Sequence, residues 1–317
     1  MKKRTIDIDN VLPSFLLVAA CSLFGGCDKI NDQHQLGHAG RDGNGEQSVQ
    51  LCTATGDVLN SLGEKFSNFS TTQHHDNSVG SNLLLDVNLP GDVAIVESCD
   101  DHAHVYAHID NPDTDIETHT EGSTLRITLS DANGDNTPIV TKNQSGGVTV
   151  NARGGNVVII NNRVYVDGKI VDPQAPLNPI KTIITVPKGV DLKLSMNGDY
   201  SFIGKVYFSN AFVTAVGNSQ LDFSANHATI ELTGANTAQV SGLSSLNVRI
   251  TGASNLFANL ASSAEVEAKI TGSGQITTRG NVRSYEASVI GSGQITHSGS
   301  VEKRTTRSLG AGQISFE

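Results

Sequence analysis

A glycine-centred motif recurs at a nearly constant interval in the second half of the chain. Its three clearest copies, at Gly272, Gly291 and Gly310, read Gly-Ser-Gly-Gln-Ile twice and then Gly-Ala-Gly-Gln-Ile, at a spacing of 19 residues. Weaker copies precede them at intervals of 17 to 20 residues and begin at Gly198, Gly217, Gly234 and Gly252. This period is shorter than that of ankyrin, tetratricopeptide or propeller repeats, and the consensus of leucine-rich repeats is missing. The repeat therefore predicts a β-solenoid in which each copy forms one coil.

The glycines of the motif are expected at the corners of the coils, where the chain has to turn with positive φ. The corner glycines that we single out are Gly252, Gly272, Gly274, Gly291, Gly293, Gly310 and Gly312. Between the corners, Val266, Ala268 and Ile270 alternate with charged residues, so they are expected to point inward. Coils stack about 4.8 Å apart, so Ser, Asn and Gln at the corners are expected to form hydrogen-bonded ladders. A β-sandwich built from regular hairpins is the alternative fold.

Composition agrees with an all-β chain. Glycine accounts for 32 of the 317 residues, and the chain has no Trp and 2 Met, which favours tight turns over helices. The net charge of −10 argues against a nucleic-acid binder, because such proteins need a basic surface. Charged residues gather in the last coil, where they suit a cap against end-to-end strand pairing; they are Glu302, Lys303, Arg304 and Arg307.

Two further regions are expected between the N-terminus and the repeats. Apolar residues alternate within 83–89, 103–109 and 125–129, which predicts half-buried strands in an N-terminal β-domain over residues 59–136. Residues 137–180 are rich in Gly and Pro and are expected to form an insertion. In this insertion, strand-like Val157–Ile160 and Val164–Val166 flank Asn161-Asn162, a type I′ turn candidate, and Asp167-Gly168 predicts a second hairpin turn. The coils then occupy residues 181–317.

The N-terminus has the pattern of an export signal. A basic start and a short, broken apolar run predict a signal peptide over residues 1–26 rather than a membrane span. Cys21 and Cys27 both follow small residues, as in the bacterial lipobox, where the cysteine sulfur carries diacylglycerol and palmitate is among the expected acyl groups. Cleavage at Cys27 leaves Cys52 and Cys99 as an even pair able to form a disulfide in an oxidising compartment, so we favour Cys27 over Cys21. An ordinary signal peptide and an unpaired Cys99 are the alternatives.

Residues 27–58 follow the signal as a polar, Gly-rich tether. Lipid chains on the cysteine would hold the protein at a membrane surface. The expected location is therefore the cell envelope, as a membrane-anchored lipoprotein on the periplasmic side or the outer surface.

A row of histidines is the most specific candidate for a functional site in the sequence. Asp100, His102, His104, Tyr106 and His108 occupy every second position, so a strand would place them on one face. With His119 on the next strand, His102, His104 and His108 form a candidate site for Zn, Cu or Ni. A solvated polar face is the alternative interpretation.

Two other acidic or histidine-containing segments carry less information. His74-His75-Asp76 is expected to lie in a loop. Asp131–Asp135 resembles the start of an EF-hand, but Asn136 and Lys142 stand where that motif needs Gly and Glu, so we reject it as an EF-hand.

The coils from Gly217 to Gly312, the strand pair around Leu83–Val96 and the segment Gly122–Ile127 together resemble the putative auto-transporter adhesin family with a head GIN domain, over residues 62–317. This resemblance implies a right-handed single-stranded β-helix, a surface or periplasmic location and, often, a lipoprotein signal. It supplies no catalytic residues.

We therefore predict a non-catalytic cell-envelope lipoprotein whose adhesin-like β-helix binds a protein or glycan partner, without a cofactor. One alternative is a polysaccharide-acting β-helix enzyme, which would need clustered carboxylates beside Lys or Arg. Against it, Arg249, Arg279 and Arg283 show no evident acidic partner in register. The other alternative is a periplasmic metal-binding protein that uses the His102, His104 and His108 row.

Overall fold

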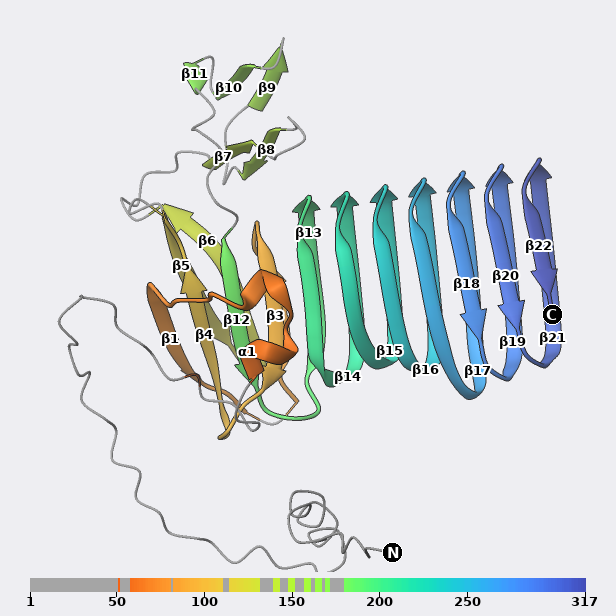
Figure 1. The fold of residues 1–317 in the computed structure, drawn as a ribbon, viewed down its shortest axis with the longest axis horizontal. Coiled ribbons are helices and arrows are strands. Elements are labelled where there is room, and N and C mark those ends of the chain that lie inside the picture. Colours follow the sequence, from red (N-terminus) through yellow and green to blue (C-terminus); the bar gives the residue numbers. More distant parts are fainter. Residues whose placement is uncertain are drawn as a thin grey trace, which may run out of the picture. The chain divides into compact units, whose positions relative to one another are not determined.

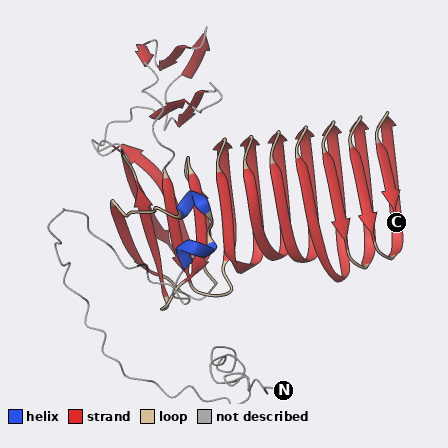
Figure 2. Cartoon of the chain, viewed as in Figure 1, coloured by secondary structure: helices blue, strands red, loops and turns tan. Residues whose placement is uncertain are grey.

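The computed structural model describes residue 51, residues 58–80, 82–110, 114–131 and 180–317, and the backbone of five short strands between residues 139 and 171. These residues belong to one compact unit. Nearly all of them lie in strands; a four-residue helix α1 (Val58–Ser61) and a 3-10 turn η1 (Glu64–Phe66) come before the first strand (Figures 1 and 2). No helix in these ranges is long and apolar enough to span a membrane. The fold is a β-solenoid, as the repeat predicted.

Two sheets face each other across the core, and both run from the N-terminal β-region into the coils. The first sheet has the pairing order β1 (Gln73–Ser78), β4 (His102–His108), β12 (Lys181–Val186), β3 (Asp92–Glu97), the first halves of β14 (Ser201–Gly217), β15 (Gln220–Gly234), β16 (Thr237–Gly252) and β17 (Asn255–Gly272), then β18 (Gln275–Arg279), β20 (Gln294–Ser298) and β22 (Gln313–Phe316). The second sheet has the order β5 (Thr114–Glu121), β6 (Thr124–Asp131), β2 (Leu84–Asn88), β13 (Asp191–Gly198), the second halves of β14 to β17, then β19 (Val282–Gly291) and β21 (Val301–Gly310).

The two sheets cross the boundary expected at residue 181 without a break. After the insertion, β12 enters the first sheet between β3 and β4, parallel to β3 and antiparallel to β4. The N-terminal β-region and the coils therefore share one core, in which alternate residues of both sheets meet.

The corner glycines pair with one another from coil to coil. Each glycine of the motif is the register partner of the next one along the chain; the series is Gly198, Gly217, Gly234, Gly252, Gly272, Gly291 and Gly310. The coils differ in length, and register shifts at the opposite corner, such as those between Ser224 and His227 and between Ala264 and Glu265, absorb the difference. The glycine corner therefore fixes the register of the solenoid.

The two glycines of each motif are required for different reasons. Gly272 has a φ of 125°, and a Cβ there would lie 2.5 Å from the backbone oxygen of Gly252. The positive φ expected at the corners is found at Gly252, Gly272, Gly291 and Gly310. It is not found at Gly274, Gly293 and Gly312, where the prediction was wrong. At Gly274 the constraint is space, because a Cβ would lie 2.6 Å from the Ser254 oxygen and 2.8 Å from Cγ2 of Ile250.

A buried polar ladder takes the place of this second glycine in the earlier coils. Ser and Asn form it as predicted, whereas the predicted contribution of the corner Gln residues was wrong. The backbone N–H of Ser219 donates to Oδ1 of Asn236 at 2.8 Å, and the backbone N–H of Asn236 donates to Oγ of Ser254 at 3.0 Å. The Ser254 hydroxyl in turn donates to the Gly234 oxygen at 3.1 Å. Because all three side chains are buried, the ladder satisfies polar groups that water cannot reach.

A second apolar cluster lies on the outer side of the first sheet. Leu62 and Phe66, from the segment that contains α1 and η1, pack against Val96, Tyr106 and Ile183 on β3, β4 and β12. Figure 1 shows α1 over these strands. The outer side of this sheet is therefore covered near its N-terminal strands and open along the coils.

The described strands of the insertion form the hairpins that the sequence predicted. β9 (Val157–Ile160) pairs with β10 (Arg163–Val166), which pairs with β11 (Lys169–Val171), all antiparallel. β7 (Ile139–Lys142) and β8 (Val148–Asn151) form a further antiparallel pair. The turn residues 161–162 and 167–168 lie outside the described residues.

The last coil is built differently from the others. On β21, Arg304, Thr306 and Ser308 pair with Tyr285, Ala287 and Val289 of β19, so polar residues take positions that are apolar one coil earlier. The guanidinium of Arg304 lies 5.4 Å from the ring centre of Phe316. The charged residues expected here, Glu302, Lys303, Arg304 and Arg307, are exposed on β21. A capping role for them stays a prediction.

Candidate functional site

Strand β4 carries the predicted histidine row on its outer side. Ala103, Val105 and Ala107 point into the core between the sheets. His102, His104, Tyr106 and His108 occupy the alternate positions, so they face outward. His104 and Tyr106 are nevertheless buried, because neighbouring side chains cover them.

The neighbouring strand β1 supplies part of this cover, and here the sequence prediction was wrong. His74, His75 and Asp76 lie in β1 rather than in a loop. In the antiparallel register, His74 is opposite Tyr106 and Asp76 is opposite His104. The polar face of β1 therefore joins the polar face of β4.

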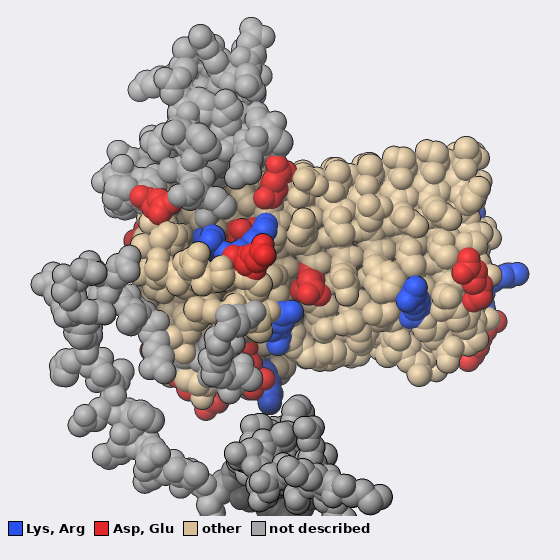
Figure 3. Space-filling view, viewed as in Figure 1, with Lys and Arg blue, Asp and Glu red and all other residues tan. Residues whose placement is uncertain are grey.

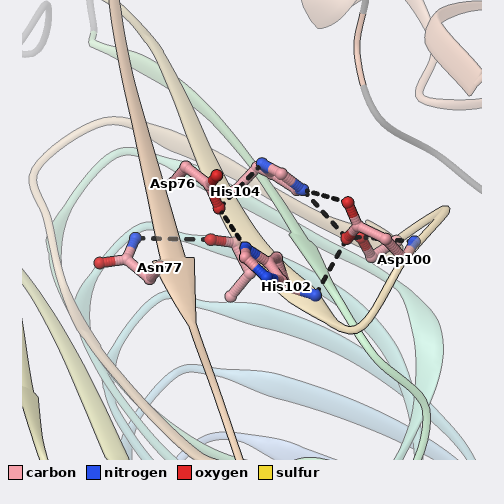
Figure 4. A network of polar contacts seen from close by, with 7 residues as sticks. Asp76, Asn77, Asp100, His102 and His104 are labelled. Atoms are coloured by element: carbon pink, nitrogen blue, oxygen red, sulfur yellow. Dashed lines mark hydrogen bonds and ion pairs between the residues drawn. The ribbon is translucent and has the colours of Figure 1, made fainter. Parts of the chain in front are cut away.

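Asp76 and Asp100 hold the histidines of this cluster from two sides (Figure 4). Oδ1 of Asp76 lies 2.7 Å from Nδ1 of His102 and 3.6 Å from Nδ1 of His104. Oδ1 of Asp100 lies 3.1 Å from Nε2 of His104 and accepts the backbone N–H of His102 at 2.9 Å. Each imidazole thus has a carboxylate beside it.

The aromatic rings of the cluster stack along the sheet. His74 and Tyr106 are 4.5 Å apart between ring centres and nearly parallel, with 4° between their planes. His104 lies 6.1 Å from Tyr106 and 6.1 Å from His102. The stack fills the surface between β1 and β4 and leaves the ring edges to the carboxylates.

Charge and burial move the pKa values in this cluster in opposite directions. The hydrogen bond to Asp76, together with its charge, raises the pKa of His102. Burial lowers the pKa of His74, and the charge of His104 adds to that effect. Burial raises the pKa of Asp100, but hydrogen bonds from the His102 backbone, Ser98 and His104 outweigh it and leave the pKa lower than usual. Asp76 therefore favours the protonated form of His102, whereas burial disfavours the protonated form of His74.

The four proposed metal ligands do not form one group: His102 and His104 are neighbours, but the other two lie elsewhere. His108 lies at the far end of β4, with its Nε2 3.2 Å from Asp110 and its Nδ1 3.0 Å from the Ser70 hydroxyl. His119 lies on β5, in the second sheet, opposite Arg126. No group of three or more His, Cys, Asp or Glu side chains within the described ranges is arranged to hold a metal ion. The histidine row is organised by carboxylates and ring stacking instead.

Of the four cysteines, only Cys99 lies within the described residues. Cys99 is disulfide-bonded in the structure. Cys52, Cys21 and Cys27 lie outside the described residues. The Cys52–Cys99 pairing and the lipidation site stay predictions.

The outer side of the first sheet along β15 to β22 is flat and bears few charges, and we call it the amide face (Figure 3). The row of register partners next to the glycine corner is exposed and uncharged; the row consists of Gln220, Thr237, Asn255, Gln275, Gln294 and Gln313. The next row consists of Asp222, Gln239, Phe257, Thr277, Thr296 and Ser315. Hydroxyl and amide groups thus repeat from coil to coil.

The outer side of the second sheet along β15 to β21 differs, and we call it the charged face. Arg283 pairs with Glu265 one coil earlier, so the expectation that Arg283 lacks an acidic partner was wrong. Glu267 pairs with Lys269 and accepts a hydrogen bond from Asn247 at 2.9 Å. The carboxylates at Glu265 and Glu267 are therefore engaged in ion pairs within the face.

Comparison with known proteins places the chain in a family. Residues 88–301, more than half of the chain, match the family described as putative auto-transporter adhesin, head GIN domain. The chain belongs to this family. The matched region of this head GIN protein begins in β2 and ends in β21, so it includes both the histidine row and the coils. A comparison with curated protein sequences finds no match.

Solved structures similar to this chain include proteins from Bacteroides and Parabacteroides species. A putative adhesin from Bacteroides fragilis is 17% identical, with 77% of this chain and 96% of that chain covered and a TM-score of 0.40. A putative lipid binding protein from Parabacteroides distasonis is 14% identical, with 77% and 96% covered and a TM-score of 0.43. A putative adhesin from Parabacteroides merdae is 14% identical, with 77% and 95% covered and a TM-score of 0.41.

Proposed function

We propose that this chain is a non-catalytic cell-envelope protein that binds a surface or envelope partner along its solenoid. The observation that carries the proposal is the flat, continuous face of parallel strands from β15 to β22, in a chain that belongs to an adhesin family. Membership of that family also points to the envelope or cell surface as its location.

The solenoid is rigid and its outer surface is repetitive. Backbone hydrogen bonds of about 2.9 Å join each corner to the previous coil, as from Gln275 to Ser254 and from Gln294 to Gly274. Such a stack holds its outward side chains at fixed spacing. A ligand that contacts several coils at once gains avidity from contacts that are individually weak. This is the requirement of an adhesive surface, and it needs no deep pocket.

The anchor in this proposal is a lipid on Cys27, with Cys21 as the alternative, followed by the tether of residues 28–58. The disulfide at Cys99 supports an oxidising compartment outside the cytoplasm. Mass spectrometry of the mature N-terminus from the membrane fraction tests the anchor. A diacylglycerol-modified Cys27 is expected, and an unmodified N-terminus would overturn this part of the proposal.

Adherence tests the binding role. Beads coated with the full-length protein should retain intact bacterial cells, and beads coated with a Gly272→Val and Gly291→Val variant, which breaks the corner, should not. Equal retention by both would contradict the proposal. A non-catalytic protein on the same beads should release no new reducing ends from a polysaccharide. Release of reducing ends would favour the polysaccharide-acting enzyme instead.

A further inference from the structure

We propose that the amide face is a binding site for an extended, uncharged polysaccharide. This inference rests on the proposed function and names both the ligand class and the side of the solenoid that takes it. It follows from three properties of the face: free hydrogen-bonding groups, little charge and few apolar anchors.

The amide face has polar groups without partners. Across the described part of the chain, the side-chain amides of Gln275, Gln294 and Gln313 make no hydrogen bond to protein. The same holds there for the amides of Gln239 and Asn255. Each amide offers donors and an acceptor. Because register pairing stacks these residues in adjacent coils, the free groups form a line along the solenoid.

The charge on this face is low and partly compensated. Its charged residues between β15 and β22 are Asp222, Arg279 and Glu317. Asp222 lies 3.6 Å from Lys205, and the Arg279 guanidinium lies 5.1 Å from the ring centre of Phe257. A charged polymer would therefore find little to attract it, whereas an uncharged one would have to displace only water.

The charged face differs from the amide face in its polar groups. Two ion pairs lie on it, in which Arg283 binds Glu265 and Lys269 binds Glu267. Further exposed charges there are Glu231, Arg249 and Glu286. A ligand there would have to compete with these ion pairs. The two sides of the solenoid thus differ in the kind of polar group that they offer: uncharged amides and hydroxyls on the amide face, and many charged groups on the charged face.

A polysaccharide fits these groups better than a protein partner does. Protein interfaces depend on a few large anchors, mainly aromatic residues and Arg, in a desolvated centre. The amide face offers Phe257 with Arg279 above it and otherwise small or amide side chains. A neutral glycan presents hydroxyl donors and acceptors along its length, which match a line of amides and hydroxyls.

The same features predict weak binding per sugar unit. A single net hydrogen bond contributes about 0.5–1.5 kcal/mol. Among the outward residues of this face between β15 and β22, Phe257 is the one aromatic side chain that could add to it, and Arg279 lies above its ring. Affinity should therefore rise with the length of the glycan until it spans the coils, and short oligosaccharides should bind poorly. Because no ion pairs are involved, binding should not depend on salt.

The test measures binding of the full-length protein to dextran, a soluble β-glucan and a galactomannan, with polygalacturonate and chitosan as charged polymers. We expect binding to at least one neutral polymer, equal in low and high salt. The double variant Gln275→Ala, Gln294→Ala should weaken it by about 5- to 150-fold, the equivalent of losing two hydrogen bonds.

The matched control is Thr251→Ala, Thr271→Ala, which alters exposed register partners on the charged face and should leave affinity unchanged. Unchanged thermal unfolding verifies that both variants fold. The inference falls if only charged polymers bind, if no neutral polymer binds, or if both variants weaken binding equally. The inference also falls if protease treatment of target cells abolishes bead adherence while periodate oxidation does not. That result would indicate a protein ligand, and the proposed adhesive function would still stand.

Discussion

Asp76 on β1 lies with its Oδ1 2.7 Å from Nδ1 of His102 on β4 and thereby links two antiparallel strands on their outer side. His102 is opposite Ser78 in the register, so the contact is diagonal across the strand pair. Such diagonal neighbours are within reach of long side chains. The contact adds a side-chain link to the backbone pairing of β1 with β4, in a segment, Gln73–Ser78, that has no apolar alternation.

Replacing Asp76 should change the titration of His102. The hydrogen bond and charge of Asp76 raise the pKa of His102 above its ordinary 6.5, so Asp76→Asn should lower it towards that value. The raised pKa means that this contact stabilises the fold below pH 6.5 and loses its effect as pH rises through the His102 pKa. NMR titration of the imidazole signals measures this, with Asp222→Asn as a remote control. An unchanged His102 pKa would contradict the assignment.

His297 should make the protein less stable in acid. It is buried on β20, with Nδ1 2.9 Å from the Thr278 hydroxyl, and burial lowers its pKa despite the opposing effect of the Ser300 and Gly280 backbone. A lowered histidine pKa gives stability that is complete above the unfolded value of 6.5 and declines as pH falls below it.

Urea unfolding at pH 7.5 and pH 5.5 measures this effect. The midpoint should fall at the lower pH, and the difference between the two pH values should shrink in His297→Gln, whatever that change does to absolute stability. His119→Gln, on the exposed side of β5, is the control. An unaltered pH difference in His297→Gln would count against the buried histidine as the source.

The corner should not tolerate a side chain at Gly272. Its φ of 125° and the 2.5 Å approach of a Cβ to the Gly252 oxygen predict that Gly272→Ala destabilises the fold by about 1–3 kcal/mol. The neighbouring exposed change Ser273→Ala should stay within about 0.5 kcal/mol of the parent. Chemical unfolding of both gives the comparison, and similar stabilities would refute the role assigned to this corner.

The polar ladder should be costly to interrupt. Ser254→Ala removes the hydroxyl that accepts the Asn236 backbone N–H at 3.0 Å and donates to the Gly234 oxygen at 3.1 Å. Because these groups are buried, the loss should be about 1–3 kcal/mol. Ser292→Ala, at an exposed corner position, should have little effect. Equal unfolding midpoints for the two variants would show that water replaces the hydroxyl.

The solenoid was predictable because its signal is local and repeated. Glycine spacing and alternation in each coil, as in Val266–Ile270, report directly on corners and inward positions. The reason for Gly274 was not predictable, because it depends on the Ile250 side chain and the Ser254 oxygen of earlier coils. Sequence alternation cannot show which coil atoms approach a corner.

The histidine cluster was predictable only in part. The alternation of His102, His104 and His108 placed them correctly on one face, but their partner Asp76 lies in a strand with no hydrophobic period. The pairing of β12 with β3 and β4 was also not predictable, because the whole insertion separates β12 from these strands in the sequence. Pairings between distant segments leave no local pattern to recognise.

If the amide face makes the adhesive contact, a charge change on each side of the solenoid should affect adherence unequally. Retention of bacterial cells is measured on beads coated with the full-length protein, with Gln275→Glu, Gln294→Glu on the amide face, or with Thr251→Glu, Thr271→Glu on the charged face. Retention should be lost with the amide-face variant and kept with the charged-face variant. Loss with the charged-face variant alone, or equal retention by all three, would contradict this expectation.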